Sequence, residues 1–185
     1  LGIDRARPLV VAGSTAPGEH ELLRDALPPG TQLLCAPRKP EWFDQAAEAL
    51  PGCVRRSAGK PRSGAEFYLL DTIGELRKAY ALADVVVVGR SFGNLYGSDP
   101  MEPAALAKPV VIGPAVSDFE SIVRTMLRAD AIVQSSAQKL ARTIAELLGD
   151  ESKRQALAQR ARQCVLANQG AAQRHAHLLH EMIAS

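Results

Sequence analysis

The sequence predicts an α/β protein whose Rossmann-like parallel sheet is flanked by helices. Short apolar stretches alternate with helix-like segments along the chain, which is typical of a parallel sheet. One stretch, Val85–Val88, is apolar at every position, as expected of a strand covered on both faces. A chain of 185 residues with 46% apolar and 23% charged residues is typical of a folded domain. We therefore expect one domain, with an α/β core over residues 1–148 and C-terminal helices over 149–185.

Composition and charge argue against several classes of protein. The net charge of +2 is too small to predict nucleic-acid binding, and aromatic residues, at 4%, are too few for a surface that stacks bases. No apolar stretch approaches the ~20 residues of a membrane span, and the first residues lack the order of a signal peptide. The three cysteines, Cys35, Cys53 and Cys164, have no metal-ligand spacing. We expect reduced thiols in a cytosolic protein that needs no metal or other cofactor.

Apolar runs separated by turn residues predict the order of the elements. Strands are expected at Leu9–Ala12, Gln32–Ala36, Cys53–Arg56, Phe67–Leu70, Val85–Val88, Pro109–Ile112 and Ala131–Gln134. Helices are expected at Glu19–Ala26, Glu41–Leu50, Glu75–Ala83, Phe119–Arg128, Lys139–Leu148, Asp150–Asn168 and Ala171–Ala184. We interpret Trp42 and Phe43 as core residues. The loop Ser57–Ala65 is rich in glycine, serine and basic residues and is expected to be mobile.

The C-terminal helices carry an apolar stripe at helical spacing and a basic face. The stripe consists of Leu157, Ala161, Cys164 and Val165. The basic face consists of Lys153, Arg154, Arg160 and Arg162. We interpret this face as solvated, and a membrane-facing patch is the alternative. The last histidines do not share a face at metal-ligand spacing and are expected on the surface. They are His175, His177 and His180.

The segment after Val85–Val88 is the first candidate for a binding site. A glycine-rich loop leads to Asp99–Pro103, which reads as a helix start because proline is tolerated in the first helical turn. In an open α/β sheet, ligands bind where a loop and a helix start meet the carboxyl end of a strand. Free amides at a helix start favour a phosphate, and Glu102 could accept two sugar hydroxyls. The alternative is a capped helix in which Glu102 only counters the helix dipole.

Three further loops follow predicted strands and carry polar groups. Ser14 and Thr15 could donate their hydroxyls to a ligand, or they could cap a helix or close a turn. Arg38 could bind a phosphate or carboxylate with two nitrogens, or it could be a solvated loop charge. The amides of Ile73 and Gly74 could reach a ligand, although the spacing of the flanking Thr72 and Glu75 also predicts a capping box.

These motifs together resemble a known family. They are GST at 13–15, PRKPEWF at 37–43, DTIGEL at 71–76, YALADVVVVG at 80–89 and DPMEPAALAKPVVIGP at 99–114. Their order and spacing are similar to the carboxyl-terminal half of 3-deoxy-D-manno-octulosonic acid (Kdo) transferases. The resemblance covers about the first three quarters of the chain, and the remaining helices carry no motif.

The resemblance implies the carboxyl-terminal, donor-binding lobe of a GT-B glycosyltransferase that adds Kdo from CMP-Kdo to a lipid A precursor in lipopolysaccharide biosynthesis. Pro37, Arg38 and the amides of Ile73 and Gly74 would contact CMP, and Glu102 would accept the ribose hydroxyls. The nucleotide site is then predicted to comprise Ser14, Thr15, Pro37, Arg38, Lys39, Ile73, Gly74, Glu75, Ser91, Asp99 and Glu102.

The same resemblance implies that the amino-terminal lobe, which is not in this sequence, carries the general base, the acceptor site and the membrane anchor. No catalytic residue is therefore assigned here, and the 185 residues alone are expected to be inactive. The full-length protein is expected at the cytoplasmic face of the bacterial inner membrane. The alternatives are a GT-B transferase or epimerase that uses a UDP-sugar, and a non-catalytic nucleotide-binding module.

The sequence also departs from the family pattern near the predicted phosphate. The family usually has histidine at the positions of Ala16 and Lys39. It often has the motif GGS where this chain has Gly89, Arg90 and Ser91. Its GGHNPLEP motif is YGSDPMEP here, so Ser98 and Asp99 replace histidine and asparagine. Asp99 should weaken the binding of an anion unless Arg90 or Lys39 offsets its charge.

Overall fold

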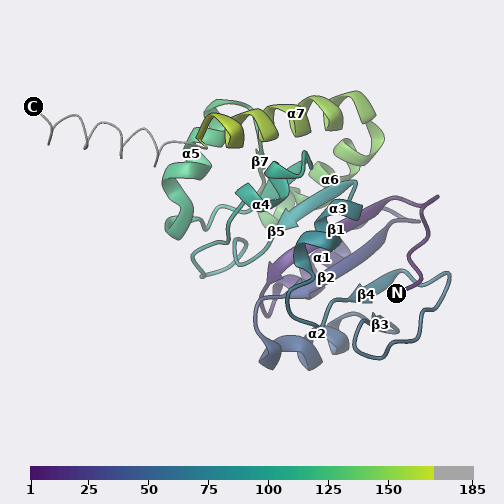
Figure 1. The fold of residues 1–185 in the computed structure, drawn as a ribbon. Helices are drawn as coiled ribbons and strands as arrows, with labels where there is room; N and C mark the ends of the chain where they lie inside the picture. Colours follow the sequence, from purple (N-terminus) through teal and green to yellow (C-terminus); the bar gives the residue numbers. More distant parts are fainter. Residues whose placement is uncertain (169–185) are drawn as a thin grey trace, which may run out of the picture.

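A computed structural model describes residues 1–168 and contains a seven-stranded parallel sheet with helices on both faces (Figure 1). The strands are β1 (Leu9–Thr15), β2 (Gln32–Pro37), β3 (Val54–Arg55), β4 (Phe67–Leu69), β5 (Val85–Val88), β6 (Val110–Ile112) and β7 (Val133–Gln134). The α-helices are α1 (Glu19–Asp25), α2 (Phe43–Ala49), α3 (Leu76–Leu82), α4 (Met101–Ala105), α5 (Glu120–Arg128), α6 (Leu140–Gly149) and α7 (Glu151–Asn168). Single 3₁₀ turns lie at Pro40–Trp42, Ser117–Phe119 and Ala137–Lys139. The predicted α/β class is confirmed, and so is the order of the predicted elements through residue 168.

The two faces of β5 explain why this strand is apolar throughout. Val86 and Val88 belong to one core cluster, together with side chains from α3, α4, α5 and α7. Val85 and Val87 belong to a second cluster, together with side chains from α1, α2 and α6. All four valines are fully buried. Alternate side chains therefore enter two separate helix layers, which is the arrangement that the run of valines predicts.

Helix α7 belongs to the folded core. Ala161, Cys164 and Val165 join the same core cluster as Ala104 of α4, and Figure 1 shows α7 crossing beside α4. The predicted stripe on this helix is confirmed, since Leu157 is also buried. Within residues 1–168, no helix combines the length and apolar character needed to cross a lipid bilayer. The predicted helix Ala171–Ala184 and its three histidines lie outside the described residues.

Several local expectations need correction. Trp42 and Phe43 are half-buried instead of belonging to the core, because they stand at the exposed start of α2. Helix α5, predicted to begin at Phe119, begins at Glu120, because a 3₁₀ turn occupies Ser117–Phe119. At the start of α3, Thr72 donates its hydroxyl to the Glu75 carboxylate at 2.5 Å, so the two side chains bond to each other and not to backbone amides.

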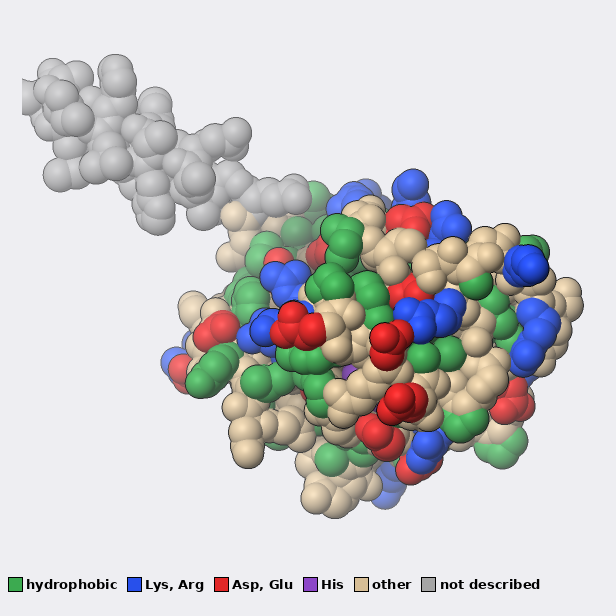
Figure 2. All heavy atoms as spheres, turned by 90° about the horizontal axis from the view of Figure 1, so that it is seen from below, with side chains coloured by type: hydrophobic (Ala, Val, Ile, Leu, Met, Phe, Trp, Pro, Cys, Tyr) green, Lys and Arg blue, Asp and Glu red, His purple; other side chains and the backbone are tan. Residues whose placement is uncertain are grey.

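The surface carries both signs of charge. Figure 2, seen from below the view of Figure 1, shows Lys and Arg side chains interspersed with Asp and Glu over the visible face. Part of the basic face of α7 is engaged by other elements. Arg154 donates to the carbonyls of Leu147 and Leu148 at the end of α6, and Arg160 donates to the carbonyl of Asp130.

Candidate functional site

The strand order places a switch point beside β1. The sheet runs β3-β4-β2-β1-β5-β6-β7, so the chain moves outward from β1 in one direction and later resumes on its other side with β5. In sheets of this kind, ligands bind outside the carboxyl ends of the strands at such a point. The ends of β1, β2 and β5 are in register, with Thr15 paired to Pro37 and Gly13 paired to Val88. The loops that carry the predicted motifs therefore leave one edge of the sheet.

A cavity of about 130 Å³ opens at this edge. It is lined by Ser14, Ala36, Pro37, Arg38, Leu70, Thr72, Ile73, Gly74 and Leu76. These residues come from the ends of β1, β2 and β4 and from the start of α3. The structure thus brings together Ser14, Pro37, Arg38, Ile73 and Gly74 from the predicted site.

The backbone around this cavity is held in unusual conformations. Ser14 has φ 56° at a bulge in β1, a conformation that L side chains seldom adopt. Such backbone strain tends to cluster at functional sites. Gly74 has φ 84° and is exposed, and in residues 1–168 the amides of Ile73 and Gly74 donate no hydrogen bond. Two backbone donors without a partner in residues 1–168 therefore belong to residues that line the cavity.

The two cations after β2 differ in their surroundings. The Arg38 amide donates to the Thr15 carbonyl at 2.9 Å, while its exposed guanidinium makes no ion pair within the described part of the chain. Lys39 instead pairs with Glu41 at 3.2 Å, and its ammonium lies 5.1 Å from the centre of the Trp42 ring. Arg38 is therefore the cation that is free to meet a ligand.

Thr15 points into the protein. Its side chain is fully buried, and its hydroxyl lies 3.1 Å from His20 Nε2 and 3.2 Å from Cys35 Sγ. Burial lowers the pKa of His20, opposed by the charge of Glu21, and burial raises the pKa of Cys35 to about 12. The hydroxyl of Thr15 is therefore engaged inside the protein, where it neither caps α1 nor lines the cavity.

Ser91 also has an internal role. Its buried hydroxyl donates to the Val88 carbonyl at 2.6 Å and accepts from the Gly113 amide at 2.8 Å. A Cβ at Gly113 would lie 2.1 Å from the Ser91 carbonyl oxygen, so the two loops are in backbone contact. The side chain of Ser91 therefore joins the ends of β5 and β6, and its predicted ligand contact has no support from its orientation.

The start of α4 lies close to the same edge. Asp99 is exposed and accepts at 2.8 Å from the amide of Met101, the first residue of α4, whose N-cap position is Pro100. Burial raises the pKa of Tyr80, and the charges of Glu102 and Asp99 raise it further. A Cβ at Gly13 would lie 1.9 Å from the hydroxyl of the same tyrosine. Tyr80 therefore lies against β1 and close enough to Glu102 and Asp99 to sense their charges, whereas Glu102 does not line the cavity.

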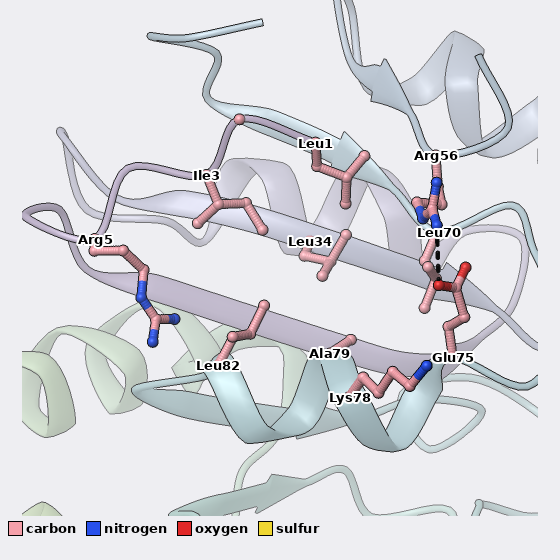
Figure 3. Close-up of a pocket in the computed structure, with 11 residues that line it drawn as sticks. Leu1, Ile3, Arg5, Leu34, Arg56, Leu70, Glu75, Lys78, Ala79 and Leu82 are labelled. Atoms are coloured by element: carbon pink, nitrogen blue, oxygen red, sulfur yellow. Dashed lines mark hydrogen bonds and ion pairs between the residues drawn. The ribbon is translucent and has the colours of Figure 1, made fainter. Parts of the chain in front are cut away.

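Glu75 faces a different cavity. Its carboxylate accepts from Thr72 at 2.5 Å and pairs with Arg56 at 3.2 Å. These two hydrogen bonds, the Thr72 one first, lower the pKa of Glu75. Figure 3 shows it at the rim of a cleft of about 320 Å³ between the N-terminal segment and α3. The floor of this cleft is apolar and includes Leu34 and Leu70.

Asp71 anchors the loop that follows β3. Its side chain is 1% exposed and accepts from the amide and hydroxyl of Ser57 and from Arg55 Nε. Burial acts to raise the pKa of Asp71, but the hydrogen bonds from Ser57 and Arg55 outweigh it and hold the pKa below its ordinary value. This cluster fixes the end of β4 directly before Thr72.

Glu19, a functional residue that its sequence context does not predict, is 4% exposed at the start of α1. Its Oε2 accepts from the amides of Ala16 at 2.9 Å and Arg90 at 2.7 Å. Its Oε1 accepts from the amides of Ser91 at 2.9 Å and Phe92 at 3.1 Å. Three of these donors lie 71 to 73 positions away in the chain. The only local signal is an acidic residue in a first helical turn, which predicts dipole compensation and nothing more.

Comparison with known proteins places the chain among glycosyltransferases. The family model described as "Glycosyl transferases group 1" matches residues 61–164. The 3-deoxy-D-manno-octulosonic acid transferase of Bordetella pertussis is 34% identical over 91% of this chain. The enzyme of the same name from Haemophilus influenzae is 32% identical over 94% of this chain. The match spans only 43% and 44% of these two relatives, so the chain corresponds to less than half of their length.

Solved structures agree with this comparison. The C-terminal CMP-Kdo binding domain of WaaA from Acinetobacter baumannii superposes with a TM-score of 0.82 at 28% identity. The match covers 86% of this chain and 89% of that domain. Anabaena Alr3699/HepE in complex with UDP superposes with a TM-score of 0.66 at 16% identity, over 98% of this chain and 50% of that chain. At that identity the second likeness indicates the fold alone.

Proposed function

The chain belongs to the glycosyl transferases group 1 family, and from that premise we propose that it is the donor-binding domain of a Kdo transferase. In this proposal the domain binds CMP-Kdo, and the complete protein transfers Kdo to a lipid A precursor. The observation that carries the proposal is the cavity where the free guanidinium of Arg38 meets the open amides of Ile73 and Gly74. These groups match an anionic nucleotide, and the likeness to a CMP-Kdo binding domain extends over most of the chain.

In this proposal, different residues around the cavity bind the phosphate, the base and the ribose of the nucleotide. Arg38 and the hydroxyl of Ser14 donate to the phosphate. The amides of Ile73 and Gly74 hold the base, and the side chain of Ile73, 76% exposed at the mouth, offers it an apolar surface. Glu102 accepts the two ribose hydroxyls from the start of α4.

This arrangement supports loss of a nucleotide leaving group. As the bond between the anomeric carbon of Kdo and the phosphate oxygen breaks, negative charge grows on CMP. A fixed guanidinium stabilises that charge without reorganising.

The cavity is too small to enclose a nucleotide sugar by itself. Ligand pockets typically measure about 300–1,000 Å³, whereas this cavity measures about 130 Å³. We propose that an amino-terminal lobe supplies the opposite wall, the general base and the acceptor site. The lipid acceptor would bring the complete protein to the cytoplasmic face of the inner membrane.

Calorimetric titration of the 185-residue chain with CMP and with UDP tests the proposal. We expect measurable binding of CMP, tighter than that of UDP, and no transfer of Kdo by this chain alone. A preference for UDP would support the alternative of a UDP-sugar enzyme. Absence of binding to both nucleotides would overturn the assignment of a donor site.

A further inference from the structure

Glu19 occupies a place where sheets of this type commonly bind an anion. The amides of Arg90, Ser91 and Phe92 follow one another directly after β5, at the switch point beside β1. Successive backbone amides in such a turn form a concave site for anions. Arg90 has φ 57°, the left-handed conformation that turns these amides in one direction. Here the anion is the carboxylate of the protein itself.

The carboxylate joins two loops of the candidate site. One oxygen is shared between the Ala16 amide in the β1 loop and the Arg90 amide in the β5 loop. The backbones also touch, since Gly89 donates to the Gly13 carbonyl at 2.8 Å and a Cβ at Gly89 would lie 2.8 Å from the Ser14 carbonyl oxygen. The strained conformation of Ser14 is therefore fixed from the side of β5.

A series of contacts continues from Glu19 to α4. The Arg90 carbonyl accepts from the Gly97 amide at 2.8 Å, which closes the loop 90–97. Gly97 has φ 86°, and a Cβ there would lie 2.9 Å from the Ala115 carbonyl oxygen. The next residues are the buried Ser98 and Asp99, which accepts from the first amide of α4. The position of Glu102 thus depends on a loop whose first amides are held by Glu19.

We infer that Glu19 is a positioning residue that fills the amide site after β5 and thereby places the donor's phosphate on the Arg38 side of the switch point. Because 90–92 are already saturated, a phosphate cannot use their amides and binds at the cavity near Ser14 and Gly74. The carboxylate also sets the separation of Ser14 from the start of α4. The ligand-binding part of this inference rests on the proposed function, and the loop-positioning part does not.

Glu19→Gln tests this role because each oxygen of Glu19 accepts two amides. A glutamine keeps one acceptor oxygen and turns an NH₂ group toward the other two donors, so it can satisfy only one pair. Glu19→Ala removes all four bonds. Glu21→Gln is the matched control, since Glu21 is an exposed residue of the same helix with no hydrogen bond to the described residues.

Two measurements are needed, CMP affinity by calorimetry and hydrogen–deuterium exchange of the segment 89–99. We expect Glu19→Gln to bind CMP about tenfold more weakly, or ~1.4 kcal/mol, at a temperature where it is fully folded. Exchange at 90–92 should accelerate by at least about tenfold relative to the rest of the sheet. Glu19→Ala should exceed both effects, and Glu21→Gln should show neither.

The outcomes separate this inference from the proposed function. If Glu19 had only a structural role, the variants would unfold more easily, but the folded chain would keep its CMP affinity and its regional exchange pattern, and the inference would fail. If the wild-type chain bound no nucleotide, the donor site would be lost, and exchange at 90–92 would still decide whether Glu19 holds the loop.

Discussion

The loops that follow β4 and β5 leave the same edge of the sheet but differ in how their polar groups are satisfied. After β4, Ile73 and Gly74 line the cavity, and their amides have no hydrogen-bond partner within residues 1–168. After β5, three successive amides are taken by the Glu19 carboxylate. Backbone donors without a partner beside a cavity are available to bind a ligand, whereas donors that already have a partner hold the loop in position. The first loop is therefore the better candidate for contact with the nucleotide, and the second is the better candidate for support.

The largest effect is expected from Gly89→Ala, which tests the supporting side. A Cβ at Gly89 would lie 2.6 Å from Thr15 Cα, so backbone would have to shift. We expect a loss of about 3 kcal/mol in the free energy of unfolding, measured by urea denaturation. Gly93→Ala is the control in the same loop, because nothing lies within 4 Å of a Cβ there and its change should stay within about 0.5 kcal/mol. Equal stability of the two variants would mean that the loops after β1 and β5 are not in close backbone contact.

The second-largest effect is expected at Asp71, which holds the loop after β3 to the end of β4. Asp71→Asn weakens the bonds to Arg55 and Ser57 in a side chain that is 1% exposed, and we expect a loss of about 2 kcal/mol at neutral pH. Asp44 pairs with the same arginine but is 86% exposed, so Asp44→Asn should change stability by less than about 0.5 kcal/mol. A comparable loss in both variants would show that burial does not decide the strength of these bonds.

The same carboxylate predicts a dependence on pH. Because the pKa of Asp71 is lowered on folding, its contribution to stability is present above the pKa of the unfolded chain. This contribution is lost as the pH falls through the lowered pKa of the folded state. Urea denaturation from pH 7 down to pH 3 should therefore show a steeper loss of stability below about pH 4 in the wild type than in Asp71→Asn. Parallel curves would contradict this assignment.

Arg38→Ala tests the open side. The guanidinium is exposed and unpaired in the described part of the chain, so its loss should leave the unfolding midpoint unchanged. CMP affinity should fall by about 1–3 kcal/mol, the scale of a lost hydrogen bond to a charged group. Arg162→Ala, an exposed charge on α7, controls for the change in net charge. If both variants bound CMP as the wild type does, the phosphate would not lie at Arg38.

Glu102→Gln should give the smallest effect and decides whether α4 belongs to the binding side. Glutamine keeps the size of the side chain and one acceptor oxygen, so we expect CMP affinity to fall by about 1 kcal/mol. Deoxycytidine monophosphate lacks one ribose hydroxyl. Its affinities for the wild type and for the variant should therefore differ less than those of CMP do. An unchanged difference between the two nucleotides in the variant would remove Glu102 from the ribose site.

Much of the fold could be predicted because it depends on local patterns. The run Val85–Val88 indicates a strand covered on both faces, and turn residues mark most boundaries within a few positions. The exposed loop group, Arg38 with Ile73 and Gly74, could also be predicted, since parallel strands bring their carboxyl ends to one edge. What these predictions share is that the backbone alone determines the result.

The direction of individual side chains could not be predicted in the same way. Ser14 and Thr15 are neighbours, yet one lines the cavity and the other turns toward His20 and Cys35 because the chain bulges between Gly13 and Thr15. In the sequence, Glu19 is an ordinary acidic residue of a first helical turn. Only in the folded protein does the loop after β5, distant in the chain, lie beside it. Such contacts depend on tertiary packing, which local spacing does not encode.

The half-buried indole in the turn after β2 gives the protein an intrinsic fluorescent reporter. Trp42 is the one tryptophan of the sequence, and it stands in the turn that follows Arg38, under the ammonium of Lys39. A phosphate drawn to this loop would alter the field across the ring, and with it the wavelength and intensity of emission. Binding of a nucleotide at Arg38 can therefore be followed by tryptophan fluorescence in unlabelled protein.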